Sequence, residues 1–222
     1  MAQKQENKTE TDLRFFGRIS ASISHELKNV LAIINENAGL LEDFTLMADQ
    51  GVPLDPARLK AMAAGVKKQI DRANTIIDNM NRFAHSADQL STNVDLAQII
   101  ELFMAVTARL AAMQGVEISL QPPGSPVTLE TAPYRLIHLL WRCLEFSMSA
   151  GGEEKQIELA IEEAADSVLI RFGRLAGLTG SMLKSFPSDG ERNLLETLGA
   201  ELTADPECNE IRIEMTKKET TN

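Results

Sequence analysis

The chain has 222 residues, of which 44% are hydrophobic and 24% are charged, and its formal net charge at pH 7 is −10. That length fits one large domain or two small ones with a buried core. The negative charge argues against nucleic acid or an anionic membrane surface as a partner. The two cysteines, Cys143 and Cys208, lie far apart and outside any Cys/His cluster, so we expect a reduced, cytoplasmic protein.

Residues 1–11 are rich in Gln, Lys, Glu and Thr, a composition that predicts a disordered N-terminus. They lack the apolar stretch of a secretory signal. No run of about 18 consecutive apolar residues occurs in the chain, so the sequence predicts no helix that spans a membrane.

A long amphipathic helix is predicted from residue 12 to about Asp49. Its apolar residues recur in steps of three and four and so form one stripe: Phe16, Ile19, Ile23, Leu27, Val30, Ile34, Leu41 and Phe44. His25 lies off this stripe, with Ala21 and Ser22 one turn before it on the same flank. These small neighbours leave room for the surface of another protein to approach the imidazole.

A second amphipathic helix follows a break at residues 50–56, where a glycine and two prolines interrupt the pattern. Asp55 is the predicted N-cap and Pro56 the first helical residue. Two long helices with a short connection form an antiparallel hairpin, here over residues 12–89. Because a single hairpin leaves each stripe half covered, we predict a homodimer in which two copies form a four-helix bundle. The alternative is a hairpin that packs on the second domain of its own chain.

A second domain is predicted over residues 94–217, after a polar linker. The expected helices are 94–115, 134–149 and 191–199, and the expected strands are 116–120, 127–129, 156–162, 167–172 and 210–215. This order predicts an α/β sandwich with helices on one face of the sheet. The complete chain is therefore expected to be α+β, a helical hairpin followed by an α/β sandwich.

The run His25-Glu26-Leu27-Lys28-Asn29 resembles the phosphoacceptor segment (H-box) of two-component sensor histidine kinases. Phe16 and Leu31 fit the same pattern, and Val30 stands where a proline is common. The close of the second helix, Asn81-Arg82-Phe83-Ala84, is also similar to that family. The resemblance implies a HisKA-like domain for dimerisation and histidine phosphotransfer, followed by an ATP-binding catalytic domain of the Bergerat fold.

That ATP-binding domain normally carries three motifs, and this chain departs from each of them. Phe146 stands where the family has a metal-holding asparagine, and an aromatic ring offers Mg²⁺ no oxygen ligand. The strand at 167–172 leads into a Gly-Arg-Leu-Ala-Gly run, residues 173–177, without the expected adenine-binding aspartate. The segment that replaces the ATP lid is short and has the single glycine Gly190 before the last helix. We therefore expect a degenerate domain that binds neither ATP nor a metal ion.

The layout is closest to that of dimeric phosphorelay phosphotransferases with a kinase-like hairpin and a degenerate ATP domain. The resemblance implies a histidine phosphotransfer protein without ATP-dependent autokinase activity. Such a protein passes phosphoryl groups between His25 and the aspartates of response-regulator receiver domains, and could also dephosphorylate the regulator. The implied roles of its neighbours are to hold the second N–H of the imidazole (Glu26), to neutralise phosphoryl oxygens (Lys28) and to orient a hydrolytic water (Asn29). The receiver domain is expected to bring its own Mg²⁺.

Two alternatives stay open at this point. A sensor-type histidine kinase with a divergent ATP site would label His25 from ATP. A non-enzymatic regulator or scaffold of a two-component system would tolerate His25→Ala. The other histidines, His85 and His138, are expected to be structural.

Overall fold

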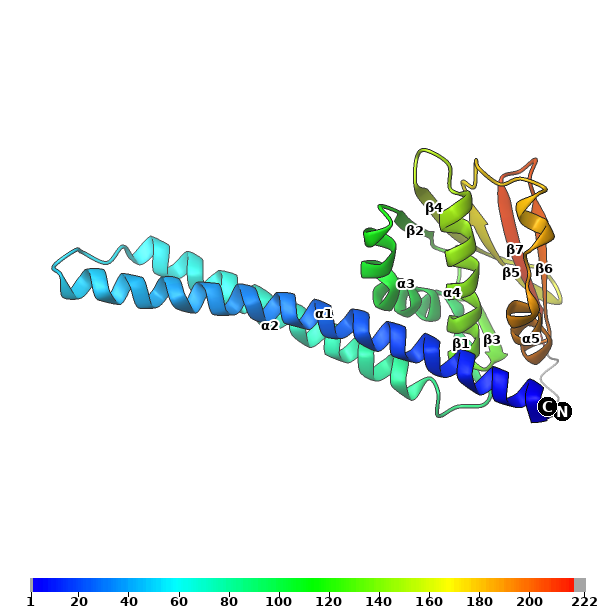
Figure 1. Cartoon of the computed structure of the whole chain (residues 1–222), viewed down its shortest axis with the longest axis horizontal. Helices are drawn as coiled ribbons and strands as arrows, with labels where there is room; N and C mark the ends of the chain where they lie inside the picture. Colours follow the sequence, from blue (N-terminus) through cyan, green and yellow to red (C-terminus); the bar gives the residue numbers. More distant parts are fainter. Residues whose placement is uncertain (1, 218–222) are drawn as a thin grey trace.

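The computed structural model describes residues 2–217 and consists of a long helical hairpin with an α/β part beside its base (Figure 1). The hairpin is formed by α1 (Ala2–Asp49) and α2 (Pro56–His85). The α/β part contains, in chain order, β1 (Thr92–Asp95), α3 (Leu96–Met113), β2 (Glu117–Gln121), β3 (Thr128–Thr131), α4 (Pro133–Ala150), β4 (Gln156–Glu163), β5 (Ser167–Gly173), the 3-10 turn η1 (Met182–Lys184), α5 (Asp189–Leu198), β6 (Ala200–Asp205) and β7 (Glu210–Thr216). The α+β class predicted from the sequence is confirmed.

The hairpin turns at the predicted break. The side chain of Asp55 accepts a hydrogen bond from the backbone N–H of Ala57 at 2.9 Å, and Pro56 is the first residue of α2. The N-terminus differs from the prediction, because α1 begins at Ala2 where disorder was expected for residues 1–11. Residues 2–11 contain no proline or glycine, and Lys, Gln and Glu are good helix formers, so the helix continues outward from its buried segment.

The main sheet has the strand order β2-β4-β5-β7-β6, in which β2 is parallel to β4 and the other neighbours are antiparallel. Ile161, Ile170 and Ile213 lie opposite one another on adjacent strands, and all are buried. The alternation of side chains along each strand gathers the apolar residues on this one face, against α3, α4 and α5. The opposite face carries charged pairs such as Arg171 with the exposed Glu162, as expected for a face in contact with water.

Two strands were not predicted. β1 pairs with β3 and occupies residues that the sequence divided between the linker and a helix, and α3 begins at Leu96, where Asp95 caps it, instead of at Val94. β6 forms the edge of the main sheet beside β7. Both strands contain Asn, Asp, Ala or Glu, which have weak strand propensity, and pairing with a neighbouring strand overrides that propensity.

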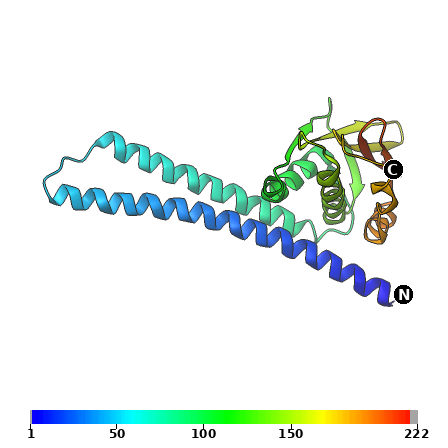
Figure 2. The ribbon, with the colours of Figure 1, turned by 45° about the horizontal axis from the view of Figure 1, so that its top comes forward.

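The base of the hairpin belongs to the core of the α/β part. Phe15, Ile19 and Ile23 of α1 and Phe83 of α2 are buried in one apolar cluster with residues of α3 and α4. The farther half of the hairpin projects away from the α/β part (Figure 2). The alternative in which the hairpin packs on its own second domain is therefore correct for the base, while the farther half remains free to meet a second copy.

The helix α3 is long and strongly apolar. Within the residues described, it is the helix whose length and composition would also suit a membrane span, with a mean hydropathy of 1.6. The core helix of a folded protein passes the same test of length and composition, so the expectation of no membrane-spanning helix stays a prediction. In the structure α3 packs against α1, α2, α4 and β2, and it buries Ile100, Phe103 and Val106 in the core.

Candidate functional site

His25 is exposed on α1, opposite the buried residues Ile23 and Val30. Lys28 and Asn29 are also exposed and lie three and four residues further along the helix, so they share the surface of His25. The structure thus brings three of the four predicted site residues to one solvent-facing surface of the hairpin. We call His25, Lys28 and Asn29 the histidine face.

The fourth predicted residue, Glu26, is oriented elsewhere. Its Oε1 accepts a hydrogen bond from Nη2 of Arg72 in α2 at 3.0 Å. Among the residues that the structure describes, the carboxylate of Glu26 therefore contacts the facing helix and not the imidazole of His25, which differs from its expected role. Successive helical residues point about 100° apart, and this explains the difference.

Charged contacts fix the α/β part to α1 two turns before His25. The guanidinium of Arg18 forms an ion pair with Glu145 of α4 and lies 4.8 Å from the centre of the Trp141 ring. Glu145 also accepts from Arg142 at 3.0 Å, and Arg142 Nε in turn donates to Glu191 at the start of α5 at 2.5 Å. One chain of ion pairs thus connects α1, α4 and α5.

Glu191 is the buried end of that chain. Burial by itself would raise the pKa of its carboxyl group, but hydrogen bonds from Ser188 and the positive charge of Arg142 outweigh burial and lower the pKa below its usual value. Glu191 also completes a capping box with Ser188 at the N-terminus of α5. The carboxylate thus joins α4 to the N-terminus of α5.

Two aromatic rings meet at the position of the missing metal-binding asparagine. Phe146 of α4 stacks on Phe186 of the β5–α5 segment, with the ring centres 4.0 Å apart and the planes within 7°. The same segment approaches the end of α4, where the backbone N–H of Gly177 donates to the carbonyl of Ala150 at 2.8 Å. A Cβ atom at Gly177 would lie 3.1 Å from that carbonyl oxygen, so a larger residue there would push the segment away from α4. The Phe186 ring and the backbone of this segment thus pack directly against α4.

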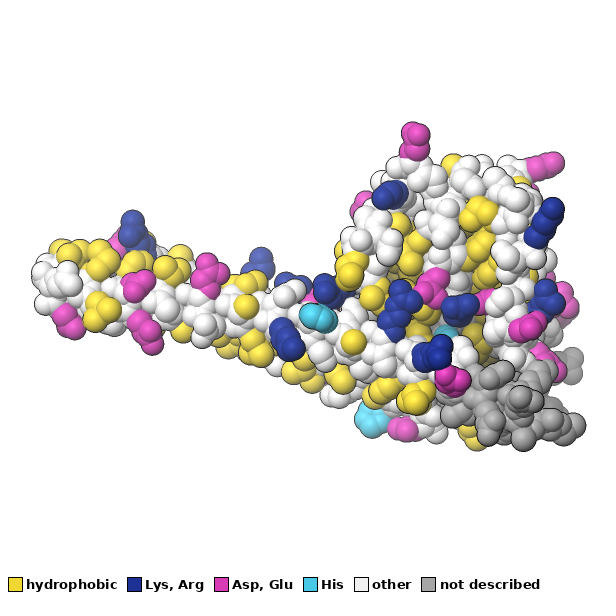
Figure 3. Space-filling model, viewed as in Figure 1, with side chains coloured by type: hydrophobic (Ala, Val, Ile, Leu, Met, Phe, Trp, Pro, Cys, Tyr) yellow, Lys and Arg dark blue, Asp and Glu magenta, His cyan; other side chains and the backbone are white. Residues whose placement is uncertain are grey.

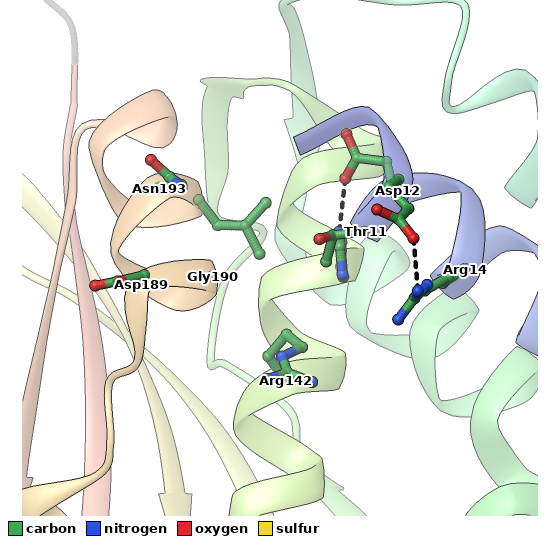
Figure 4. Close-up of a pocket in the computed structure, with 10 residues that line it drawn as sticks. Thr11, Asp12, Arg14, Arg142, Asp189, Gly190 and Asn193 are labelled. Carbon is green, nitrogen blue, oxygen red and sulfur yellow. Dashed lines mark hydrogen bonds and ion pairs between the residues drawn. The ribbon is translucent and has the colours of Figure 1, made fainter. Parts of the chain in front are cut away.

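A cavity of about 340 Å³ lies between the start of α1, α4 and the N-terminus of α5 (Figure 4). Its histidine and arginine side chains already have carboxylate partners. His138 Nδ1 lies 2.8 Å from Asp12, Arg14 donates to Glu10, and Arg142 is held by Glu145 and Glu191. In the described part of the chain no cluster of three or more His, Cys, Asp or Glu side chains is arranged to hold a metal ion.

Arg72 was not among the site residues predicted from the sequence. It lies 46 residues from Glu26, and only the register of the hairpin brings the two side chains together. The signal that could have revealed it is a basic residue on the second helix that lies across the hairpin from the phosphoacceptor segment. His138 is structural, as expected, since it is buried beside Asp12. His85 is exposed and lies 2.9 Å from Asp88.

Comparison with known proteins gives one curated relative. The chain is 29% identical over 149 residues to the C4-dicarboxylate transport sensor protein DctB of Pseudomonas aeruginosa, which covers 64% of this chain and 22% of the relative. The chain thus spans about a fifth of the length of the relative that it matches. No family model matches.

Solved structures of histidine kinases are also similar. Histidine kinase ThkA in complex with response regulator protein TrrA matches with 15% identity and a TM-score of 0.47, over 100% of this chain and 67% of that chain. Histidine kinase AdeS of Acinetobacter baumannii matches with 10% identity and a TM-score of 0.46, over 89% of this chain and 98% of that chain. The chain is thus similar to two-component sensor histidine kinases, as its motifs indicated.

Proposed function

We propose that this chain is a dimeric, cytoplasmic histidine phosphotransfer protein of a two-component phosphorelay. It passes phosphoryl groups between His25 and the aspartate of a response-regulator receiver domain. Two observations support the proposal: His25 is exposed on the histidine face, and Phe146, which stands where the resemblance implies a metal-holding asparagine, stacks on Phe186. An exposed histidine is thus accessible to a partner protein, and aromatic side chains occupy the position where the resemblance implies a ligand of the metal ion.

The proposed reaction takes place between the imidazole of His25 and the acyl phosphate of the receiver domain. A neutral ring nitrogen of His25 attacks phosphorus in line through its lone pair, and an N–P bond forms. The bond from phosphorus to the aspartyl oxygen breaks, and its electron pair remains on the aspartate as carboxylate. The other ring nitrogen then releases its proton to water. The receiver domain supplies Mg²⁺.

Two further residues of the histidine face suit this reaction. Lys28 lies one turn beyond His25 and supplies a positive charge for the equatorial phosphoryl oxygens, on which negative charge accumulates. Asn29 presents an amide that can orient a water molecule towards the aspartyl phosphate, which would give the protein a regulator phosphatase activity as well. Transfer and hydrolysis would then share one surface.

The decisive experiment measures where His25 obtains its phosphoryl group. Purified protein is incubated with radiolabelled ATP and Mg²⁺, and separately with a labelled, phosphorylated receiver domain. His25→Ala is the test variant, and His85→Ala removes another exposed histidine as the matched control. We expect no label from ATP, and label from the receiver domain in the wild type and His85→Ala but not in His25→Ala.

One observation favours a second candidate, a sensor-type histidine kinase: the curated relative is a sensor protein. In that case ATP alone would label the wild-type protein at His25, and the proposal of transfer without ATP would be wrong. Absence of label from ATP and from every phosphorylated receiver tried would contradict both functions.

A further inference from the structure

The ion pair between Glu26 and Arg72 lies beside the histidine face and has no assigned role. Glu26 is the residue that follows His25, and its side chain is 24% exposed, whereas that of Arg72 is 48% exposed. The carboxylate is thus largely removed from water and depends on the guanidinium for compensation of its charge.

Three helices hold this pair in place. Glu26 and Arg72 line a cavity of about 240 Å³ together with Thr75 and Asn79 of α2. Ile23 and Ile76 contribute apolar walls, and α3 closes the cavity with Ala105 and Val106. The apolar walls limit the positions that the carboxylate can occupy. Among these positions, the contact with Arg72 favours the one in which Glu26 lies in the groove between α1 and α2.

This orientation matters for the chemistry at His25. The transferring phosphoryl group is anionic, and a carboxylate without a partner on the adjacent residue would repel it. Arg72 compensates that charge and holds the carboxylate on the groove side of α1. The side chains that remain on the histidine face are the neutral Asn29 and the cationic Lys28.

We propose that Arg72 is a positioning residue for phosphoryl transfer at His25, which acts by holding and neutralising Glu26. The inference rests on the proposed function, since it concerns the same histidine. It also assigns Glu26 a role different from direct contact with the imidazole. Arg72 itself need not touch the phosphoryl group.

Four variants separate this role from a structural one. Arg72→Gln leaves Glu26 without its partner, Arg72→Lys keeps the positive charge, Glu26→Gln removes the carboxylate, and the double variant Glu26→Gln/Arg72→Gln removes both charges. Lys68→Gln is the matched control, because it deletes an exposed cation one turn away on α2. Far-UV circular dichroism and thermal melting confirm that each variant is folded.

The test uses two phosphodonors, a phosphorylated receiver domain and the small anionic reagent phosphoramidate, which transfers its phosphoryl group to histidine with release of ammonia. We expect Arg72→Gln to slow the maximal rate of His25 phosphorylation about fivefold with either donor, with little change in the donor concentration that gives half the maximal rate. Arg72→Lys and Lys68→Gln should stay near wild type. The double variant should recover, because no uncompensated carboxylate remains.

The salt dependence of the phosphorylation rate distinguishes the two roles, because a purely structural defect would not decrease as salt is added. The defect of Arg72→Gln should shrink as the salt concentration rises towards 1 M, where the screening length is about 3 Å. Equal phosphoramidate rates in wild type and Arg72→Gln at low salt overturn the inference, as does a double variant no faster than Arg72→Gln. If phosphoramidate shows the dependence on Arg72 but no receiver domain transfers to the wild type, the positioning role stands and the proposed phosphorelay function fails.

Discussion

Phe15 of α1 stacks on the imidazole of His138 in α4, with ring centres 4.4 Å apart and planes 2° from parallel. Phe83 of α2 meets the same Phe15 ring edge-on at 5.7 Å, and the hydroxyl of Tyr134 donates to the carbonyl of Asp12 at 2.8 Å. Aromatic residues of both hairpin helices thus pack on α4. The hairpin base and the α/β part should therefore unfold as one cooperative unit.

Replacing Phe15 with alanine tests this coupling. Phe15 is 4% exposed, and its truncation leaves a cavity between α1, α2 and α4, so we expect a loss of about 3–5 kcal/mol in the free energy of unfolding. Urea titration followed by circular dichroism measures the loss. Leu13→Ala, at a side chain that is 69% exposed, is the control and should change stability by less than about 0.5 kcal/mol. An unchanged urea midpoint for Phe15→Ala would mean that the stack does not join the two parts.

Glu191 makes the stability sensitive to acid. Its pKa is lowered in the folded protein, so the carboxylate stabilises the fold above the ordinary glutamate pKa of about 4.3, and that contribution is lost as the pH falls through the lowered value. Glu191→Gln should therefore destabilise the protein by about 2 kcal/mol at pH 7, with a difference that shrinks below about pH 4. Unfolding titrations over that pH range check this. The exposed control Glu201→Gln should follow the wild type throughout, and a deficit for Glu191→Gln that does not depend on pH would point to packing instead of charge.

Local chemistry explains which features could be predicted from the sequence. Asp55 and Pro56 start α2, and Gly199 adopts the left-handed conformation at the end of α5 with φ of 62°, as their residue types indicate. The exposure of His25 follows from helical periodicity alone. The stack of Phe146 on Phe186 and the pairing of Glu26 with Arg72 join distant segments, so their partners depend on tertiary packing and register, which periodicity does not encode.

Two glycines of the β5–α5 segment, Gly177 and Gly180, differ in how closely they approach other atoms, so one can serve as the control for the other. A Cβ atom at Gly177 would lie 3.1 Å from the carbonyl oxygen of Ala150, whereas a Cβ at Gly180 would meet no atom within 4 Å. We expect Gly177→Ala to cost about 1–3 kcal/mol of unfolding free energy, because the segment must move away from α4. Gly180→Ala should be close to neutral. Thermal melting of the two variants checks this, and equal melting temperatures would show that the segment is not packed tightly on α4.

The two thiols should differ in reactivity. Cys143 is fully buried, and burial raises the pKa of its thiol, so we expect it to react with a thiol reagent only when the protein unfolds. Cys208 is exposed, and its pKa is raised first by a hydrogen bond with Asp205 and then by the charge of that carboxylate. Asp205→Ala should therefore speed the reaction of Cys208 with a disulfide reagent at pH 8, whereas Glu207→Ala should change it less. Rapid labelling of both thiols in the native protein would contradict the burial of Cys143.

The farther half of the hairpin should mediate dimerisation. Large apolar side chains are exposed there in the single chain, among them Leu41 at 47%, Leu46 at 60% and Ile70 at 47% (Figure 3). A second hairpin would cover these residues, and a four-helix bundle is the arrangement that buries both stripes. We expect the wild type to sediment at twice the chain mass of 24.4 kDa.

The double variant Leu46→Glu/Ile70→Glu places charges on this surface, so we expect it to sediment at the mass of one chain. Its far-UV circular dichroism should be unchanged, because both side chains are exposed in the single chain. The control Glu36→Lys/Asp78→Lys changes exposed polar positions on the same two helices and should remain dimeric. Phosphorylation of His25 by phosphoramidate should survive in the monomeric variant, because the histidine face and the Glu26–Arg72 pair lie within one chain. A monomeric wild type at micromolar concentration would refute the bundle, and loss of labelling on dissociation would mean that the partner copy completes the site.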